Sequence, residues 1–220
     1  MFVEYNKIPL TLSPVSGIID YNSFTTVIPM TQIPPHNTEA SVSRQLKIEE
    51  CLLQNMAQLP YDRISVADLC RQMGISRRLY YTYFPDKDSC LISILDHFIR
   101  DSIESLPVVP FNPDSIFTVT VAYLNYWRAR ADFLDLIIKH NLKALMIEQS
   151  FLYFKHHEYN VLERLSTPEI KADDSILWLY VAIRYVALLQ WHENQYALSV
   201  EEMAAKYLRM LKQPIIQDLV

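Results

Sequence analysis

Residues 64–87 read ISVADLCRQMGISRRLYYTYFPDK, and this stretch decides the fold. Ser65 stands where a helix N-cap is expected, and Asp68 follows three residues later, in a variant of the capping box that has Asp in place of Glu. The next apolar residues recur at helical spacing and form one buried face: Val66, Leu69, Cys70 and Met73. Gly74 suits the left-handed position just beyond a helix end. The pattern predicts a short helix that ends in a tight turn.

A second short helix is expected directly after this turn, over residues 77–84. Ser76 is its N-cap, and Pro85 prevents its continuation. Tyr80 and Phe84 lie four residues apart, so both rings should face the hydrophobic core. Two short helices joined by a glycine turn are the parts of a helix-turn-helix. Other small helical hairpins share this spacing, so the spacing alone does not identify a DNA-binding protein.

The outward face of this second helix carries groups that suit DNA. Arg77 and Arg78 can each make two hydrogen bonds to guanine, and each such pair discriminates between bases by about 1–3 kcal/mol. Hydroxyl groups and an ammonium group suit phosphate oxygens, as does the N-terminus of the helix that follows Ser65. The expected DNA-binding residues are Ser65, Ser76, Arg77, Arg78, Leu79, Tyr81, Thr82, Tyr83 and Lys87. The arginines can also be ordinary solvated charges, and the tyrosines can be packing residues.

The same segment resembles the DNA-binding signature of the TetR-type (TetR/AcrR-like) transcriptional regulators. The matching features are Ile64-Ser65-Val66, Gly74-Ile75-Ser76, the aromatic run Tyr80-Tyr81, then Phe84, and Lys87 after Pro85-Asp86. The resemblance implies contacts with the DNA backbone at Tyr81 and Lys87. Arg78 and Leu79 depart from the family pattern, where small residues are usual, which puts the operator sequence in doubt but not the fold.

The composition favours an all-α protein. The 220 residues include only two glycines, too few for the tight turns of a sheet-rich fold or for a phosphate-binding loop. The net charge of −5 is unusual for a protein that binds nucleic acid. However, residues 41–90 carry seven basic and six acidic side chains, whereas residues 91–220 carry twelve and sixteen. A local basic surface can therefore bind phosphate while the acidic remainder limits indiscriminate binding.

Other classes of protein find little support. No catalytic motif and no paired carboxylates at informative spacing are present, so an enzyme is not expected, and no cofactor or metal site is expected either. The three cysteines form no CxxC pair. Inert core thiols are the main interpretation for them, with redox sensing as a minor alternative. The longest apolar run, residues 176–191, is shorter than the ~20 residues that span a bilayer. Without a signal peptide pattern, we expect a cytoplasmic protein.

Three regions follow from these patterns. Residues 1–40 are rich in proline and lack periodicity, so a flexible N-terminal extension is expected there. Translation from Met30 is an alternative explanation of the first 29 residues. Residues 41–90 form the expected three-helix DNA-binding domain, and residues 91–220 form the expected helical-bundle domain for ligand binding and dimerisation.

The helices expected over 173–195 and 199–211 are candidates for a homodimer interface. The first is apolar nearly all round, so it must be covered on more than one side. Two such helices and their symmetry mates would form a four-helix interface, and the family resemblance implies the same dimer. A dimer would read two half-sites about 34–36 Å apart, which predicts a palindromic operator on double-stranded DNA.

Aromatic residues of the second half can line a ligand pocket. The candidates are Tyr123, Trp127, Phe133, Tyr153 and Trp178. Aromatic residues at helical spacing are more often part of a core, and this alternative stays open. The leading hypothesis is a repressor that a small-molecule inducer releases from its operator. The second is a regulator that a protein partner controls through the helical domain.

Overall fold

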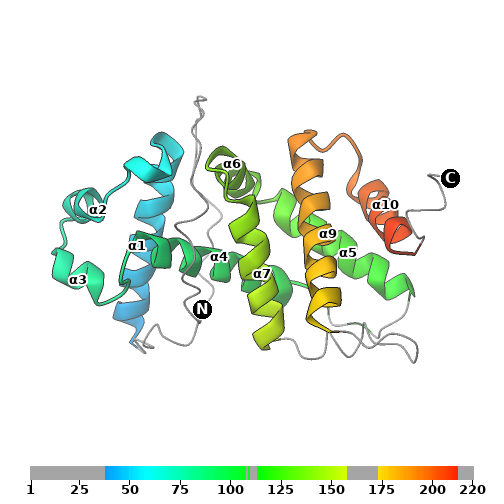
Figure 1. The fold of residues 1–220 in the computed structure, drawn as a ribbon, viewed down its shortest axis with the longest axis horizontal. Coiled ribbons are helices and arrows are strands. Elements are labelled where there is room, and N and C mark those ends of the chain that lie inside the picture. The colour runs from blue at the N-terminus through cyan, green and yellow to red at the C-terminus, as the bar shows by residue number, and fades with distance from the viewer. Residues whose placement is uncertain (1–37, 108, 110–112, 158–172, 213–220) are drawn as a thin grey trace. The chain divides into compact units, whose positions relative to one another are not determined.

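The computed structural model describes residues 38–107, 109, 113–157 and 173–212, and within them all regular structure is helical (Figure 1). This confirms the predicted all-α class. None of the described helices is long and apolar enough to cross a membrane. The extension expected over residues 1–40 lies outside the described residues up to position 37.

The chain divides into two compact units, 1–97 with 136–142, and 98–135 with 143–220. The boundary that we expected at residue 90, between a DNA-binding and a regulatory domain, remains a prediction about function. The two units are described separately below.

The first unit contains the helices that the sequence predicts around the glycine turn. These are α1 (Glu39–Gln58), η3 (Tyr61–Arg63), α2 (Val66–Met73), α3 (Arg77–Tyr81) and the first part of α4 (Lys87–Glu104). α1 begins after Thr38, whose hydroxyl accepts a hydrogen bond from the Ser41 amide at 3.3 Å. α1 packs against α2, and α2 packs against α3.

The core of the first unit is apolar and closely packed. Tyr80 and Phe84 are fully buried, which confirms that both rings face inward. They share the core with Ile48, Leu52, Met56, Leu69, Leu91 and Leu95. The cysteines Cys51, Cys70 and Cys90 are free and buried, and burial raises the pKa of each thiol. A raised pKa keeps the thiols protonated and unreactive, as expected of core residues.

A buried polar cluster joins α1 to α4 within this unit. The Glu49 carboxylate is fully buried and accepts hydrogen bonds from Ser93 Oγ at 2.8 Å and from Gln45 Nε2 at 3.1 Å. His97 Nδ1 lies 3.0 Å from the other carboxylate oxygen. A buried carboxylate is costly unless it is paired and hydrogen-bonded, so these contacts hold α1 and α4 in one arrangement.

Residues 136–142 close the C-terminal end of α1. Lys139 Nζ donates hydrogen bonds to the carbonyl oxygens of Met56 and Ala57, at 3.2 and 2.6 Å. His140 Nε2 lies 2.8 Å from the Met56 carbonyl oxygen. The last carbonyls of a helix have no partner within the helix, so these side chains satisfy them. Burial lowers the pKa of His140, against the opposing effect of this hydrogen bond.

The second unit is a helical bundle. It is formed by α5 (Pro113–Arg128), α7 (Lys143–His157), α9 (Asp174–Glu193) and α10 (Val200–Lys212), together with the end of α4 and the start of α6 (Ala131–Lys139). α9 packs against α5, α7 and α10, and α10 also packs against α5. Asp173 caps α9, and Ser199 and Glu202 form a reciprocal capping box at α10.

One helix is shorter than the sequence predicts. α3 ends at Tyr81, whereas a helix over 77–84 was expected. Thr82 Oγ1 donates a hydrogen bond to the Leu79 carbonyl at 2.7 Å, in competition with the helical backbone pattern. Pro85 also disfavours helical backbone at Phe84. The predicted length of this helix is therefore wrong, although Tyr80 and Phe84 still share the core.

Candidate nucleic-acid interface

Three capping hydrogen bonds fix the start of α2, the turn that follows it and the start of α3. Ser65 Oγ accepts from the Asp68 amide at 3.1 Å, and Ser76 Oγ accepts from the Leu79 amide at 3.1 Å. Gly74 has φ 66° and ψ 31°, the left-handed conformation that favours glycine. The Ile75 amide then bonds to the Cys70 carbonyl at 3.0 Å, as in a Schellman-type helix end. The described geometry is that of a helix-turn-helix.

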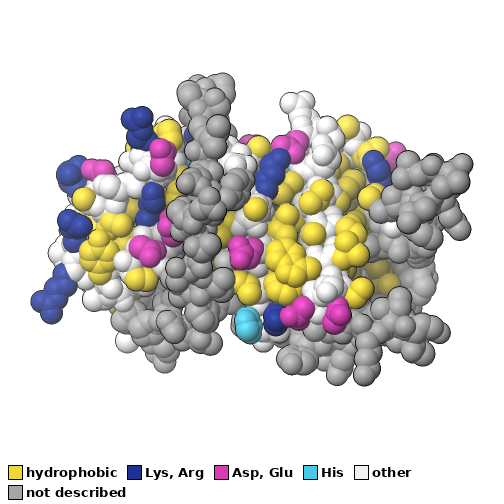
Figure 2. All heavy atoms as spheres, in the orientation of Figure 1, with side chains coloured by type: hydrophobic (Ala, Val, Ile, Leu, Met, Phe, Trp, Pro, Cys, Tyr) yellow, Lys and Arg dark blue, Asp and Glu magenta, His cyan; other side chains and the backbone are white. Residues whose placement is uncertain are grey.

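The outward face of α3 is exposed and basic. Arg77, Arg78 and Thr82 are exposed, as is Ser76 at the helix start, and Tyr81 keeps 45% of its surface accessible. Arg77 Nη2 lies 3.4 Å from the Tyr81 hydroxyl, and the guanidinium lies 6.0 Å from that ring. Arg78 forms no ion pair within the described residues. Figure 2 shows Lys and Arg side chains gathered at the edge where α2 and α3 lie.

Two expected DNA-binding residues lie elsewhere. Tyr83 is 5% exposed, and its hydroxyl accepts hydrogen bonds from Ser41 Oγ and Arg44 Nη1, both at 3.2 Å. These hydrogen bonds lower the pKa of Tyr83. Leu79 is half-buried. Tyr83 therefore anchors the segment after α3 to α1. Its burial fits the alternative interpretation, a packing residue, better than a residue that contacts DNA.

Lys87 is tied to the segment that precedes α2. Its Nζ donates hydrogen bonds to the carbonyl oxygens of Tyr61 and Ile64, at 2.6 and 3.0 Å, and lies 4.0 Å from the centre of the Tyr61 ring. Burial lowers the pKa of Lys87. An ammonium group has three donors, so two hold the protein and one remains for a phosphate. Lys87 thus positions the start of α2 in addition to any contact with DNA.

The N-terminus of α2 already holds a carboxylate. Asp68 accepts hydrogen bonds from Ser65 Oγ at 2.5 Å and from Arg71 Nη1 at 2.6 Å, and both lower the pKa of Asp68. A phosphate at this helix end would have to share the site with a negative charge. Ser65 is therefore a weaker candidate for phosphate binding than the exposed hydroxyl groups of α3.

Relatives of known type share part of this chain. It is 34% identical over 70 residues to the HTH-type transcriptional regulator EthR of Mycobacterium tuberculosis, which is 32% of each chain. It is 29% identical over 97 residues to the uncharacterised HTH-type transcriptional regulator YuxN of Bacillus subtilis, covering 42% of this chain and 33% of YuxN. The matches thus span about a third of these curated relatives, and no family model matches the chain.

A solved structure shares the fold more completely. The crystal structure of a TetR-family transcriptional regulator from Syntrophomonas wolfei aligns with a TM-score of 0.59 at 16% identity. The alignment covers 78% of this chain and 94% of that chain. This chain therefore shares the fold of that TetR-family structure.

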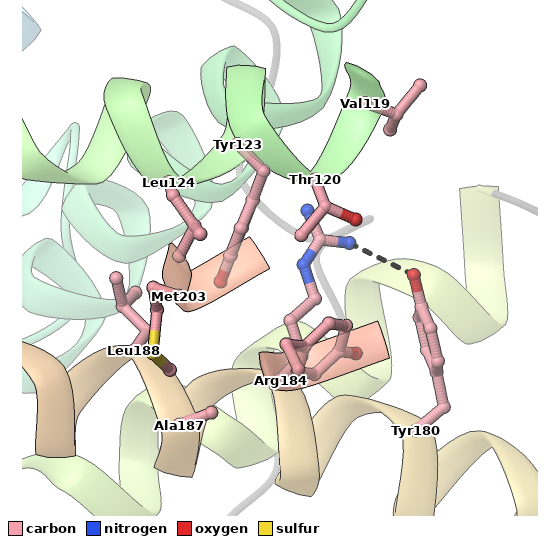
Figure 3. Close-up of a pocket in the computed structure, with 10 residues that line it drawn as sticks. Val119, Thr120, Tyr123, Leu124, Tyr180, Arg184, Ala187, Leu188 and Met203 are labelled. Carbon is pink, nitrogen blue, oxygen red and sulfur yellow. Dashed lines mark hydrogen bonds between the residues drawn. The ribbon is translucent and has the colours of Figure 1, made fainter. Parts of the chain in front are cut away.

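The second unit of the chain contains a small cavity between α5, α9 and α10 (Figure 3). Its volume is about 40 Å³. The lining residues are Val119, Thr120, Tyr123, Leu124, Tyr180, Arg184, Ala187, Leu188, Met203 and Tyr207. Of the five aromatic residues expected in a pocket, only Tyr123 lines this cavity.

The other four expected pocket residues have structural positions. Trp127 is fully buried, with its ring centre 6.3 Å from that of Tyr123, and Phe133 stacks on Phe98. Tyr153 is buried. Trp178 is 40% exposed and stacks on Phe151 at 4.7 Å. Trp127, Phe133 and Tyr153 are therefore core residues, which was the alternative to a pocket, whereas Trp178 lies on the surface of this unit.

Sequence reasoning missed Arg184, the one charged residue that lines the cavity. A signal for it was present, since Arg184 is the single charge in the apolar run 176–191. A charge in the middle of a buried helix marks either a satisfied ion pair or a site that receives a ligand.

Proposed function

We propose that this TetR-type chain is a sequence-specific DNA-binding transcriptional regulator that reads double-stranded DNA with the exposed face of α3. The observation that carries the proposal is the pair of exposed guanidinium groups, Arg77 and Arg78, on α3. Ser76 caps the start of this helix, and the glycine turn at Gly74 precedes it. Tyr81 and Thr82 would add phosphate contacts on the same face. The names of the partial relatives support this assignment.

The regulator would act as a homodimer through α9 and α10. Three large apolar side chains of α9 are exposed: Trp178 at 40%, Leu179 at 57% and Val186 at 55%. Leu179 and Val186 are seven residues apart, so they lie on one side of the helix, and Figure 2 shows hydrophobic side chains gathered over α9. On α10, Met210 is 43% exposed. An exposed apolar stripe of this kind is typical of a protein interface, and a twofold dimer would place two recognition helices on a palindromic operator.

Control by a small molecule is the leading form of regulation that we propose. A ligand bound in the second unit would favour a state with another spacing of the recognition helices, and so release a repressor from its operator. A coupling of about 1–3 kcal/mol is sufficient. The alternative is a protein partner that binds the helical domain, and the small volume of the cavity excludes a drug-sized ligand in the described conformation. We place the protein in the cytoplasm, where its three buried thiols would stay reduced.

Selection of bound fragments from random double-stranded DNA tests the proposed function. We expect a palindromic consensus. Its half-sites should lie one helical turn of DNA apart, about 34–36 Å, or a whole multiple of that distance. The variant with both Arg77→Ala and Arg78→Ala, run in parallel, should recover no consensus. If the native chain enriches no sequence at low ionic strength, the proposed function is wrong.

A further inference from the structure

The cavity of the second unit contains a buried positive charge that has no counter-ion among the described residues. Arg184, on α9, is 8% exposed, and no Asp or Glu of the described residues forms an ion pair with it. Its guanidinium carbon lies 3.5 Å from the centre of the Tyr123 ring and 5.6 Å from that of Phe154. Its Nη1 donates one long hydrogen bond, of 3.4 Å, to the Tyr180 hydroxyl.

These contacts leave most of the guanidinium unsatisfied. A guanidinium has five N–H donors, and a buried charge is costly unless it is both paired and hydrogen-bonded. Aromatic faces compensate part of that cost through cation–π attraction, but they accept no hydrogen bond in the plane of the guanidinium. In the part of the chain that the structure describes, the site therefore lacks an acceptor with negative charge.

Two tyrosine hydroxyls in the same cavity also lack a hydrogen-bond partner among the described residues. The Tyr207 hydroxyl is buried and makes no hydrogen bond within the described residues. The Tyr123 hydroxyl is buried as well, which raises its pKa. It lies close to the Arg184 and Tyr185 side chains, but neither meets full hydrogen-bond geometry, nor does any other described residue. Figure 3 shows Arg184 extending from α9 toward α5, into the space that these side chains enclose. The guanidinium fork of Arg184 and these two tyrosine hydroxyls thus line one cavity.

We propose that this cavity binds a small monocarboxylate with an apolar body, and that this ligand is the effector of the regulator. A planar carboxylate matches the guanidinium fork and accepts two parallel hydrogen bonds, while the tyrosine hydroxyls donate to its remaining lone pairs. The rest of the lining is largely apolar and suits a hydrocarbon body: Val119, Leu124, Ala187, Leu188 and Met203. One positive charge balances a monoanion but not the double charge of a phosphate.

The volume sets the size of the ligand. A cavity of about 40 Å³ holds roughly three water molecules, because one water needs about 10–15 Å³ on this scale. A carboxylate with a short alkyl chain, of the size of butyrate, replaces such a cluster. A larger body requires movement of the flexible Met203 side chain.

Calorimetric titration of the full chain with butyrate and with its neutral isostere butyramide tests the inference. We expect butyrate to bind about 10- to 100-fold more tightly than butyramide, the loss expected when a charged hydrogen bond is removed. Arg184→Gln should lose the same factor for butyrate and bind butyramide unchanged. Tyr207→Phe should weaken butyrate binding several-fold. Arg209→Gln, on the exposed side of α10, should change nothing.

Three outcomes would overturn the inference. They are equal binding of butyrate and butyramide, binding of inorganic phosphate in preference to butyrate, and no binding of butyrate by the native chain. If Arg184→Gln fails to fold, as judged by circular dichroism, the isostere pair and Tyr207→Phe still decide the matter.

The inference rests on the proposed function, and its failure can be distinguished. If the chain selects an operator but does not bind butyrate, the proposed DNA-binding function stands and the inferred ligand is wrong. If the chain binds butyrate but selects no DNA, the carboxylate site stands, but the proposal that it is the effector site of a DNA-binding regulator is wrong. Release of the selected operator by butyrate, and not by butyramide, would support both.

Discussion

Replacement of Arg78 by alanine should weaken binding to the selected operator by about 30-fold or more. Arg78 is exposed on α3 and has no ion pair within the described residues, so it gives up no internal contact when it binds a base. One bidentate contact between arginine and guanine discriminates by about 1–3 kcal/mol. A dimer carries two copies, which gives about 2–6 kcal/mol and hence at least a 30-fold loss.

Fluorescence anisotropy with a labelled operator, at one fixed salt concentration, measures this loss. A duplex of scrambled sequence, titrated in parallel, reports non-specific binding, which should fall much less because phosphate contacts carry no sequence information. Arg128→Ala is the matched control, because it removes the same charge from an exposed position on α5. Arg78→Lys keeps the charge but not the planar fork, so it should restore non-specific binding only.

The pattern of losses decides between base reading and general attraction. Equal losses for operator and scrambled duplex would show that Arg78 contacts only phosphates. An equal loss in the Arg128→Ala control would show that net charge alone is responsible. Unchanged operator binding in Arg78→Ala would refute the reading of bases by this face of α3.

Three further predictions concern the turn, the pH dependence and the dimer. Gly74→Ala should lower the free energy of unfolding by about 1–2 kcal/mol, because φ 66° is unfavourable for a side chain although the space is open; urea unfolding measures this, and an unchanged midpoint would contradict it. Stability should fall as the pH drops below about 6.5, because burial lowers the pKa of His140 and the unfolded chain therefore binds that proton more readily; His140→Gln should remove this part of the pH dependence, and an identical profile would count against it. Leu179→Glu should convert the dimer to monomer in sedimentation velocity, since it places a charge on the exposed apolar face of α9; a dimer that persists would exclude this face from the interface.

Local chemistry made the helix-turn-helix predictable from sequence. The caps at Ser65 and Ser76 and the left-handed Gly74 each depend on residues within five positions of one another, so a short stretch of sequence determines them. The inward positions of Tyr80 and Phe84 followed from helical spacing alone, even though α3 ends before Phe84.

Residues whose roles depend on distant partners were not predictable in the same way. Tyr83 is buried because Ser41 and Arg44 reach its hydroxyl from about forty positions away. Lys87 turns toward carbonyls that lie 26 and 23 residues earlier. Nothing in the spacing around these residues indicates such contacts.

The cavity illustrates the same limit in the second unit. Aromatic residues were expected to line it, yet the larger rings pack on one another, as Trp127 does on Tyr123. The side chains that enclose the space come from three helices, and α10 lies some eighty residues after α5. Only the isolated charge of Arg184 in an apolar run marked the site in the sequence.

The salt dependence of operator affinity tests most directly whether this acidic chain engages DNA through a local basic surface. Log K plotted against log salt concentration should fall with a slope of about −5, which corresponds to roughly six neutralised phosphates per dimer. A flat response, or no binding to any duplex at low ionic strength, would contradict the assignment of α3 as a DNA-binding helix.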